Sequence, residues 1–188
     1  KITLSIQPRQ NSSNQIINFT EPSQPARIDA RIYTAKLPKT IAERQRKLLL
    51  QSALKFQNIE HIDVQHSDGP GNAVCIRLCS SKHTTGPRSA GTLGPRFAGT
   101  LIFTAFGMKG KPSKDVIGEV VSSAKSFLTS GAAVDSYLAD QLLIYMAISK
   151  AGCYTTDRLT NHLLTNIEVI KRFLPVNFST HQQGQIYK

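Results

Sequence analysis

Alternating apolar and polar residues predict strands in the first fifth of the chain. Lys1 to Pro8 and Ile28 to Ala35 both alternate with the period of two that is typical of a half-buried strand. A short apolar segment, Ile16 to Phe19, predicts a further strand between them. Glu21 to Pro25 contains two prolines and a serine, which indicates a linker, so we expect a domain boundary there.

Four segments have the periodicity or the end signals of helices. Thr40 to Glu43 forms a capping box ahead of an apolar stretch, which predicts a helix to about Phe56. A second helix begins near Ser113 and ends at Gly131, the residue type most common just past a helix. The last two helices are expected at Val134 to Lys150 and Leu163 to Leu174, the latter ended by Pro175.

Shorter strands are interspersed with these helices. The turn-rich segment Ser67 to Asn72 separates His61 to His66 from Ala73 to Cys79, which predicts a hairpin. The remaining strands are expected at Thr100 to Phe106, Cys153 to Thr156 and Val176 to Thr180, with a frayed strand at Gln185 to Tyr187. Because helices and strands mix without a regular βαβ rhythm, the expected fold class is α+β.

Composition narrows the class of protein. The 188 residues are 40% hydrophobic, enough for a core, and no apolar run is long enough to cross a bilayer, so we expect neither disorder nor a membrane partner. Three cysteines without metal-ligand spacing, and no secretion signal, favour a reducing compartment, and we expect a cytoplasmic protein. The first residue is Lys1 rather than Met, which indicates a piece of a longer polypeptide.

Positive charge is concentrated in the middle of the chain. The net charge is +11, and no acidic residue occurs between Asp68 and Asp115, where seven Lys and Arg residues lie. This region either attracts RNA phosphates or is a solvated basic surface. Within it, 86–93 is repeated almost unchanged as 94–101, which indicates either a duplication tolerated in a surface loop or a basic flap that closes on RNA through Arg88 and Arg96.

One apparent nucleotide motif is excluded. Phe106 to Pro112 is rich in glycine and lysine, but a P-loop needs Gly in place of Ala105 and Ser or Thr in place of Pro112. We therefore expect an ordinary turn from strand to helix. Cys75 and Cys79 are about 13 Å apart on a strand, too far to share a metal or a disulfide.

The third expected helix carries a candidate nucleotide-binding face. Tyr137, Asp140 and Gln141 are spaced i, i+3 and i+4 and share one face, whereas Leu138, Leu142, Tyr145 and Met146 form an apolar stripe. An aromatic ring, a carboxylate and a carboxamide together could stack on a base and hydrogen-bond a nucleotide. The alternative is a solvent-facing stripe of the helix.

The fourth expected helix carries a candidate nucleophile. His162 lies near its start, with Thr165 and Asn166 on the same face and Thr160 or Asn161 available as the N-cap. Exposed N–H groups at a helix start favour a bound anion, so a neutral imidazole beside them could attack an α-phosphate covalently. The alternative is a histidine that merely lies near a cap.

These segments resemble the RNA 3'-terminal phosphate cyclase family. The resemblance lies in Ser130 to Leu143, His162 to Asn166 and Arg172 to Val176, and Asp68 to Asn72 also resembles a turn of the family. It extends in order over nearly the whole chain.

The resemblance implies an ATP-dependent enzyme that converts a 3'-terminal phosphate of RNA to a 2',3'-cyclic phosphodiester. His162 matches the histidine that forms a covalent link to AMP, and Tyr137, Leu138, Ala139, Asp140 and Gln141 match the nucleotide-binding segment. The implied partners are RNA with a 3'-terminal phosphate, ATP, and Mg²⁺ or another divalent cation. No residue of the chain is assigned to the metal, because the family's acidic contact would lie upstream of Lys1.

The resemblance also implies a domain plan. Residues 1–27 and 132–188 would belong to a large domain of repeated βαβαββ units, partial here, and 28–131 would form a small α/β insert domain. Since part of the site would lie upstream, we expect weak or no cyclisation by these 188 residues alone. The rival hypothesis is a non-catalytic cyclase-like RNA-binding protein of ribosome or RNA maturation; the presence of His162 argues against it. The oligomeric state is not predicted.

Overall fold

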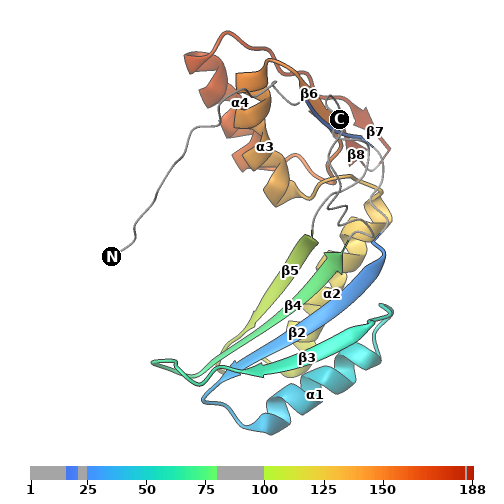
Figure 1. Cartoon of the computed structure of the whole chain (residues 1–188), viewed down its shortest axis with the longest axis vertical. Helices are drawn as coiled ribbons and strands as arrows, with labels where there is room; N and C mark the ends of the chain where they lie inside the picture. The colour runs from blue at the N-terminus through green and yellow to red at the C-terminus, as the bar shows by residue number, and fades with distance from the viewer. Residues whose placement is uncertain (1–15, 21–24, 80–99, 185) are drawn as a thin grey trace, which may run out of the picture.

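The computed structural model describes residues 16–20, 25–79, 100–184 and 186–188, which form a mixed α/β structure (Figure 1). In chain order the elements are β1 (Ile17–Phe19), β2 (Arg27–Ala35), α1 (Lys39–Leu50), β3 (Asn58–Asp63), β4 (Gly71–Cys79), β5 (Thr100–Gly107), α2 (Ser113–Ser130), α3 (Ser136–Ser149), β6 (Gly152–Tyr154), α4 (Asn161–Phe173), β7 (Gln182–Gln183) and β8 (Ile186–Tyr187). One part contains the elements from β2 to α2, and the other contains α3, α4 and the four short strands.

A four-stranded sheet in the order β3-β2-β4-β5 organises the first part. β2 and β3 are parallel and are joined by α1, whereas β4 is antiparallel to both of its neighbours. Because side chains alternate along a strand, Ala30, Ile32 and Thr34 of β2 share one face. All three are buried, so this face of the sheet faces the core.

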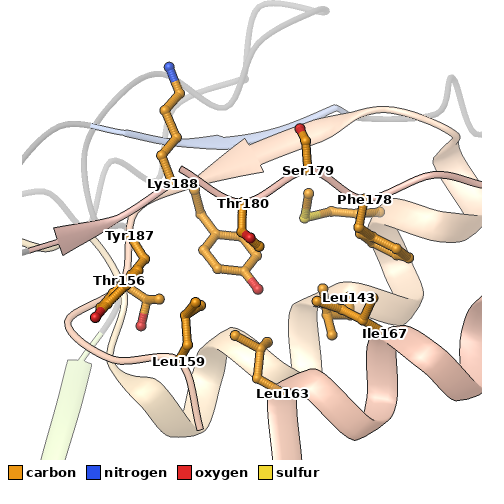
Figure 2. A pocket seen from close by; sticks show the side chains of 12 residues that line it. Leu143, Thr156, Leu159, Leu163, Ile167, Phe178, Ser179, Thr180, Tyr187 and Lys188 are labelled. Carbon is orange, nitrogen blue, oxygen red and sulfur yellow. The ribbon is translucent and has the colours of Figure 1, made fainter. Parts of the chain in front are cut away.

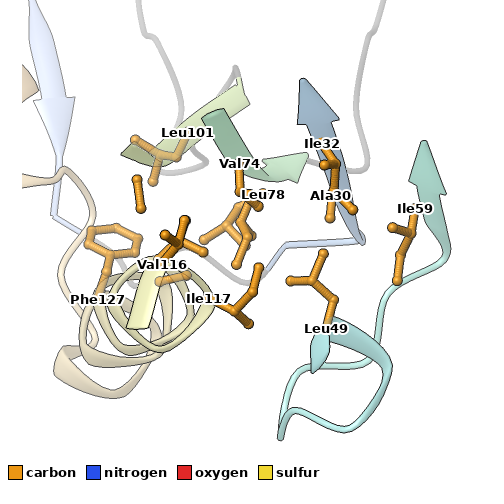
Figure 3. Close-up of a cluster of buried hydrophobic side chains, with 14 of the residues drawn as sticks. Ala30, Ile32, Leu49, Ile59, Val74, Leu78, Leu101, Val116, Ile117 and Phe127 are labelled. Carbon is orange, nitrogen blue, oxygen red and sulfur yellow. The ribbon is translucent and has the colours of Figure 1, made fainter. Parts of the chain in front are cut away.

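Both α1 and α2 pack on that one face of the sheet. Figure 3 shows Leu49 of α1 and Val116, Ile117 and Phe127 of α2 directed at the strands. The buried positions of α2 recur with helical spacing, which is why this sequence forms an amphipathic helix. Figure 3 thus shows a two-layer arrangement, with helices below and strands above.

The second part has its own apolar cluster. β1 and β6 pair in parallel, β7 and β8 form a small antiparallel ladder, and α3 packs against α4. The buried members of this cluster are Val134, Ala139, Leu143, Tyr154, Leu163 and Ile167. The chain passes from α2 to this part through Gly131, which ends α2 in the left-handed conformation with φ of +74°.

Most of the expected elements are confirmed. β1, β2, β4, β5, β6, α2, α3 and α4 lie where the sequence places them to within a few residues, α1 begins near Thr40 as expected, and Gly131 ends α2 as expected. The described helices include none that is both long and apolar enough to cross a membrane. The expected strand Lys1 to Pro8, most of the linker and most of the duplicated segment lie outside the described residues.

Three local expectations are wrong. α1 has Pro38 as its N-cap without a capping side chain, and it ends at Leu50 rather than near Phe56. β3 does not form a hairpin with β4, because β2 lies between them. Val176 to Thr180 is not a strand; Val176 and Phe178 are half-buried without a ladder partner among the described residues.

Candidate functional site

α3 and α4 begin side by side. Val134 and Thr156 form a parallel β-bridge, and the Val134 N–H donates to the carbonyl of Thr155 at 3.0 Å. Val134 directly precedes the N-cap of α3, and Thr156 precedes the start of α4 by five residues. Because bridged parallel segments run in the same direction, both helices start at the same edge of this small sheet.

Asp135 fixes the start of α3. Its Oδ1 accepts a hydrogen bond from the N–H of Leu138 at 2.7 Å, which makes it a side-chain N-cap. Burial raises the pKa of Asp135 above its ordinary value, and the charges of Asp157 and Asp140 act in the same direction, while the bond from Leu138 opposes them. The carboxyl groups of Asp135 and Asp157 are therefore close enough to interact.

The candidate nucleotide-binding segment divides between solvent and core. Tyr137 is 78% exposed, Gln141 is also exposed, and Asp140 is half-buried. Ala139 is fully buried and Leu138 packs against the second cluster, so these two side chains face inward. The three polar or aromatic residues that share a helix face are thus the members of the segment with side chains open to a ligand.

The apolar stripe expected on α3 is partly wrong. Leu138, Leu142 and Met146 do pack against the second cluster, but the fully buried positions are Ala139, Leu143 and Ala147, and Tyr145 is exposed. α3 is apolar over most of its circumference, so periodicity alone does not select the buried face.

Tyr154 connects β6 to the first turns of α3. Its hydroxyl donates to the carbonyl of Ala139 at 2.7 Å, and its ring lies in the second cluster. Burial, and to a smaller extent the negative charge of Asp140, raises the pKa of Tyr154 above its ordinary value. The hydroxyl therefore remains a hydrogen-bond donor over the whole physiological pH range and holds the candidate segment in place.

His162 lies on the exposed first turn of α4. Thr160 is the N-cap, its hydroxyl accepting from the N–H of Leu163 at 3.1 Å, so His162 is the second residue of the helix. His162, Thr165 and Asn166 are all exposed. The N–H groups of Asn161 and His162 precede the first intrahelical hydrogen bond, so they have no acceptor within α4 and are available to an anion next to the imidazole.

A small cavity lies between α3 and α4 (Figure 2). It has a volume of about 50 Å³ and is lined mainly by apolar side chains, including Leu143, Leu163, Ile167 and Phe178. Ligand pockets for molecules of drug or cofactor size measure roughly 300–1,000 Å³, so a nucleotide does not fit inside it.

The described residues contain no group of three or more His, Cys, Asp or Glu side chains that could hold a metal ion. Asp135 is engaged as a helix cap and is buried. Asp157 lies 4.0 Å from Arg158, and its Oδ1 is buried without a hydrogen-bond partner among the described residues. Among the residues that the structure describes, these donors do not fit a metal site.

Sequence reasoning did not single out Asp157 or Tyr154 as parts of the site. Asp157 comes three residues after the end of β6, and side chains beyond the end of a strand often lie near a helix start. Tyr154 lies in a strand of apolar and small residues, and a buried tyrosine hydroxyl needs a hydrogen-bond partner. Neither of these sequence features shows that the side chains lie near the start of α3.

Comparisons with known proteins agree with the resemblance seen in the sequence. A family model described as RNA 3'-terminal phosphate cyclase matches residues 1–180. Proteins named RNA 3'-terminal phosphate cyclase match from Salmonella agona (33% identical, 85% of this chain, 42% of the relative) and from Koribacter versatilis (31%, 97% and 47%). A third, from Ralstonia nicotianae, is 38% identical over 64% of this chain and 30% of its own length. The chain spans less than half the length of these relatives.

Proposed function

The chain belongs to the RNA 3'-terminal phosphate cyclase family, and we propose that it contributes the nucleophile and part of the nucleotide site to an ATP-dependent cyclase that acts on RNA 3'-phosphate ends. The observation that carries this proposal is the position of His162. Its imidazole lies exposed on the first turn of α4, and α4 starts at the same edge as α3 with its exposed Tyr137.

His162 is the proposed nucleophile. An imidazole nitrogen attacks the α-phosphorus of ATP, the bond to the β-phosphate oxygen breaks, and pyrophosphate leaves. A terminal phosphate oxygen of the RNA then takes the AMP group from His162. The neighbouring 2'-hydroxyl attacks the activated 3'-phosphate, a 2',3'-cyclic phosphodiester forms and AMP is released. The first-turn N–H groups of α4 favour the phosphate oxygens electrostatically.

The first turns of α3 are the proposed nucleotide-binding segment. The exposed ring of Tyr137 is suited to stack on adenine, and Asp140 and Gln141 are suited to position the nucleotide by hydrogen bonds. The Leu138 and Ala139 side chains pack into the core, so their contribution is to hold this turn against α4 and β6.

A divalent cation such as Mg²⁺ would offset phosphate charge in this chemistry. Because the described residues hold no suitable cluster of donors, we assign none of them to a cation and derive no step from one. The family plan that we propose has 1–27 and 132–188 in the large repeated domain and 28–131 as the insert. The two apolar clusters support most of this division, because the buried members of the second all belong to 132–188. The exceptions are Ala132 and the half-buried Ile186, which pack with the first cluster.

A labelling experiment tests the proposal. The longest natural polypeptide that contains these 188 residues is incubated with ATP labelled at the α-phosphate and a 3'-phosphorylated oligoribonucleotide. We expect protein-bound AMP that is labile to acid, together with cyclic RNA ends. His162→Asn abolishes both. His181→Asn, which alters another exposed histidine, is the matched control and keeps both.

Two outcomes would overturn the proposal. If His162→Asn retains acid-labile AMP, His162 is not the nucleophile. If the unaltered protein binds RNA but forms neither bound AMP nor cyclic ends, the rival function of a non-catalytic RNA-binding protein is correct.

A further inference from the structure

The sheet of the first part has a second face that no described helix or strand covers. Both helices pack on the face that carries Ala30 and Ile32, as Figure 3 shows. On β5 the opposite face carries Ile102 and Phe106, which are 55% and 63% exposed. Exposed large apolar side chains gathered on one surface commonly mark a binding site. We call this surface the open sheet face.

The strand register places an aromatic row across the open sheet face. Tyr33 of β2 pairs with Ala73 of β4, and Ala73 pairs with Phe106 of β5. Since neighbouring strands are about 4.8 Å apart, Tyr33 and Phe106 are roughly 10 Å apart across the sheet. In this row only the small side chain of Ala73 lies between them.

Arginines lie in the next rows of the same face. Arg31 pairs in register with Cys75, one row from the aromatic residues, and Arg77 pairs with Asp29 and Ile102, two rows away. Alternate residues on a strand are about 7 Å apart, so the guanidinium groups are within reach of a ligand that rests on the rings. Arg77 has no ion pair or side-chain hydrogen bond among the described residues.

Each of the two acidic residues of this face contacts an arginine. Asp29 contacts Arg27 at 2.8 Å, and Glu60 contacts Arg31 at 2.9 Å. Three arginines against two acids leave the face with a net charge of +1, in a chain whose net charge is +11. A second copy of the chain would bring like charges together, whereas a polyanion is attracted.

We propose that the open sheet face binds single-stranded RNA, with bases stacked on Tyr33 and Phe106 and phosphates contacted by Arg77. An uncovered sheet with exposed aromatic and basic side chains has the two features that single-stranded RNA requires: flat apolar surfaces for bases and cations for the backbone. The face lies in the first part of the molecule, apart from His162, and so holds the RNA body rather than its reacting end. The inference rests on the proposed function in one respect, that the ligand is RNA.

The test measures RNA binding without the reaction. A fluorescent oligoribonucleotide with a 3'-hydroxyl end is titrated with the 188-residue chain in the absence of ATP, and its anisotropy is recorded. Stacking on an aromatic ring contributes on the order of 1–3 kcal/mol per base, so we expect Phe106→Ala to weaken binding at least about fivefold. Phe106→Trp retains a stacking surface and is expected to bind like the unaltered chain.

Matched control variants distinguish RNA binding by the open sheet face from the effect of removing any exposed ring or any positive charge. Phe173→Ala removes a ring that is 80% exposed on α4 and leaves affinity unchanged. Arg77→Ala weakens binding and lowers the salt dependence by about one counterion, whereas Arg44→Ala, which removes an equal charge from α1, has a smaller effect. Tyr33→Leu removes the aromatic ring but keeps an apolar side chain, and it should weaken RNA binding. Its circular dichroism spectrum should match that of the unaltered chain, which would show that the fold is retained.

Several results would overturn the inference. The first is that the unaltered chain does not bind the oligoribonucleotide. The second is that the Phe106→Ala chain binds it as tightly as the unaltered chain. The third is that Phe106→Ala and Phe173→Ala weaken RNA affinity equally. A Phe106→Ala change that dissociates a dimer in light scattering without altering RNA affinity would assign the face to a second copy. AMP transfer retained by His162→Asn would overturn the proposed function and leave RNA binding by this face intact, whereas equal RNA binding by the Phe106→Ala and unaltered chains would overturn only this inference.

Discussion

Tyr154→Phe removes one oxygen atom from the contact that holds the first turns of α3. The hydroxyl donates to the carbonyl of Ala139 at 2.7 Å within the second apolar cluster. A typical intramolecular hydrogen bond contributes about 0.5–1.5 kcal/mol to the free energy of unfolding. The carbonyl of Ala139 keeps its helical bond to the N–H four residues on, so it is not left unpaired. We therefore expect a loss of about 1 kcal/mol.

The loss is measured by urea denaturation followed by the circular dichroism of the helices. The midpoint should fall while the slope with urea stays constant, since the surface exposed on unfolding is unchanged. Tyr154→Ala, which also removes the buried ring, should cost about 3–5 kcal/mol. Tyr145→Phe is the matched control because this hydroxyl belongs to an exposed residue of α3, and it should change stability by less than about 0.5 kcal/mol.

The pH dependence gives an independent check. Because the pKa of Tyr154 is higher in the folded chain than its unfolded value of 10.0, its contribution is intact below pH 10 and is lost as pH rises toward the folded value. The gap between the unaltered chain and Tyr154→Phe should narrow above that pH. An unchanged midpoint for Tyr154→Phe, or a gap that widens above pH 10, would refute the role given to this hydroxyl.

Three further predictions concern stability. Asp135→Asn retains an N-cap acceptor and removes a buried carboxylate whose pKa is raised in the folded chain. A raised pKa favours folding below pH 3.8, and this contribution is lost as pH rises. In thermal melts the Asp135→Asn chain should therefore be more stable than the unaltered chain at about pH 7, and this difference should vanish near about pH 4. A gain that grows toward acid would contradict this. Ile32→Ala, at a fully buried position, should cost about 2–5 kcal/mol in urea titrations, and Ile102→Ala on the open sheet face should cost much less; equal losses would disprove that only one face is covered. Gly131→Ala should cost about 1 kcal/mol because φ is +74°, whereas Gly69→Ala meets open space and should be nearly neutral; a neutral Gly131→Ala would refute the strain argument.

The sequence predicts those elements whose pattern is local. Alternation identifies β2 because Ala30, Ile32 and Thr34 share one buried face, and Gly131 marks the end of α2 because the helix ends there in a left-handed conformation. Of the two N-cap candidates of α4, Thr160 and Asn161, the N-cap is Thr160. Its signal is also local, because its hydroxyl accepts a hydrogen bond from the N–H of Leu163, three residues further along the chain.

The incorrect predictions concern features that depend on contacts between residues far apart in the sequence. β3 is followed closely by β4, but it pairs with β2, because α1 returns the chain in parallel beside β2. α1 ends at Leu50, where the Ser52 hydroxyl bonds the carbonyl of Leu49, yet the apolar residues continue and pack on the core without helical structure. The juxtaposition of α3 and α4 depends on a bridge between segments 22 residues apart, which neither segment encodes alone.

The most direct test of the central claim is to locate the AMP group. The longest natural polypeptide containing these residues is incubated with ATP alone, digested under non-acidic conditions and analysed by tandem mass spectrometry. We predict one AMP group, on His162, at the first turn of α4. An adduct on a different residue, or none in a protein that still produces cyclic RNA ends, would contradict the account.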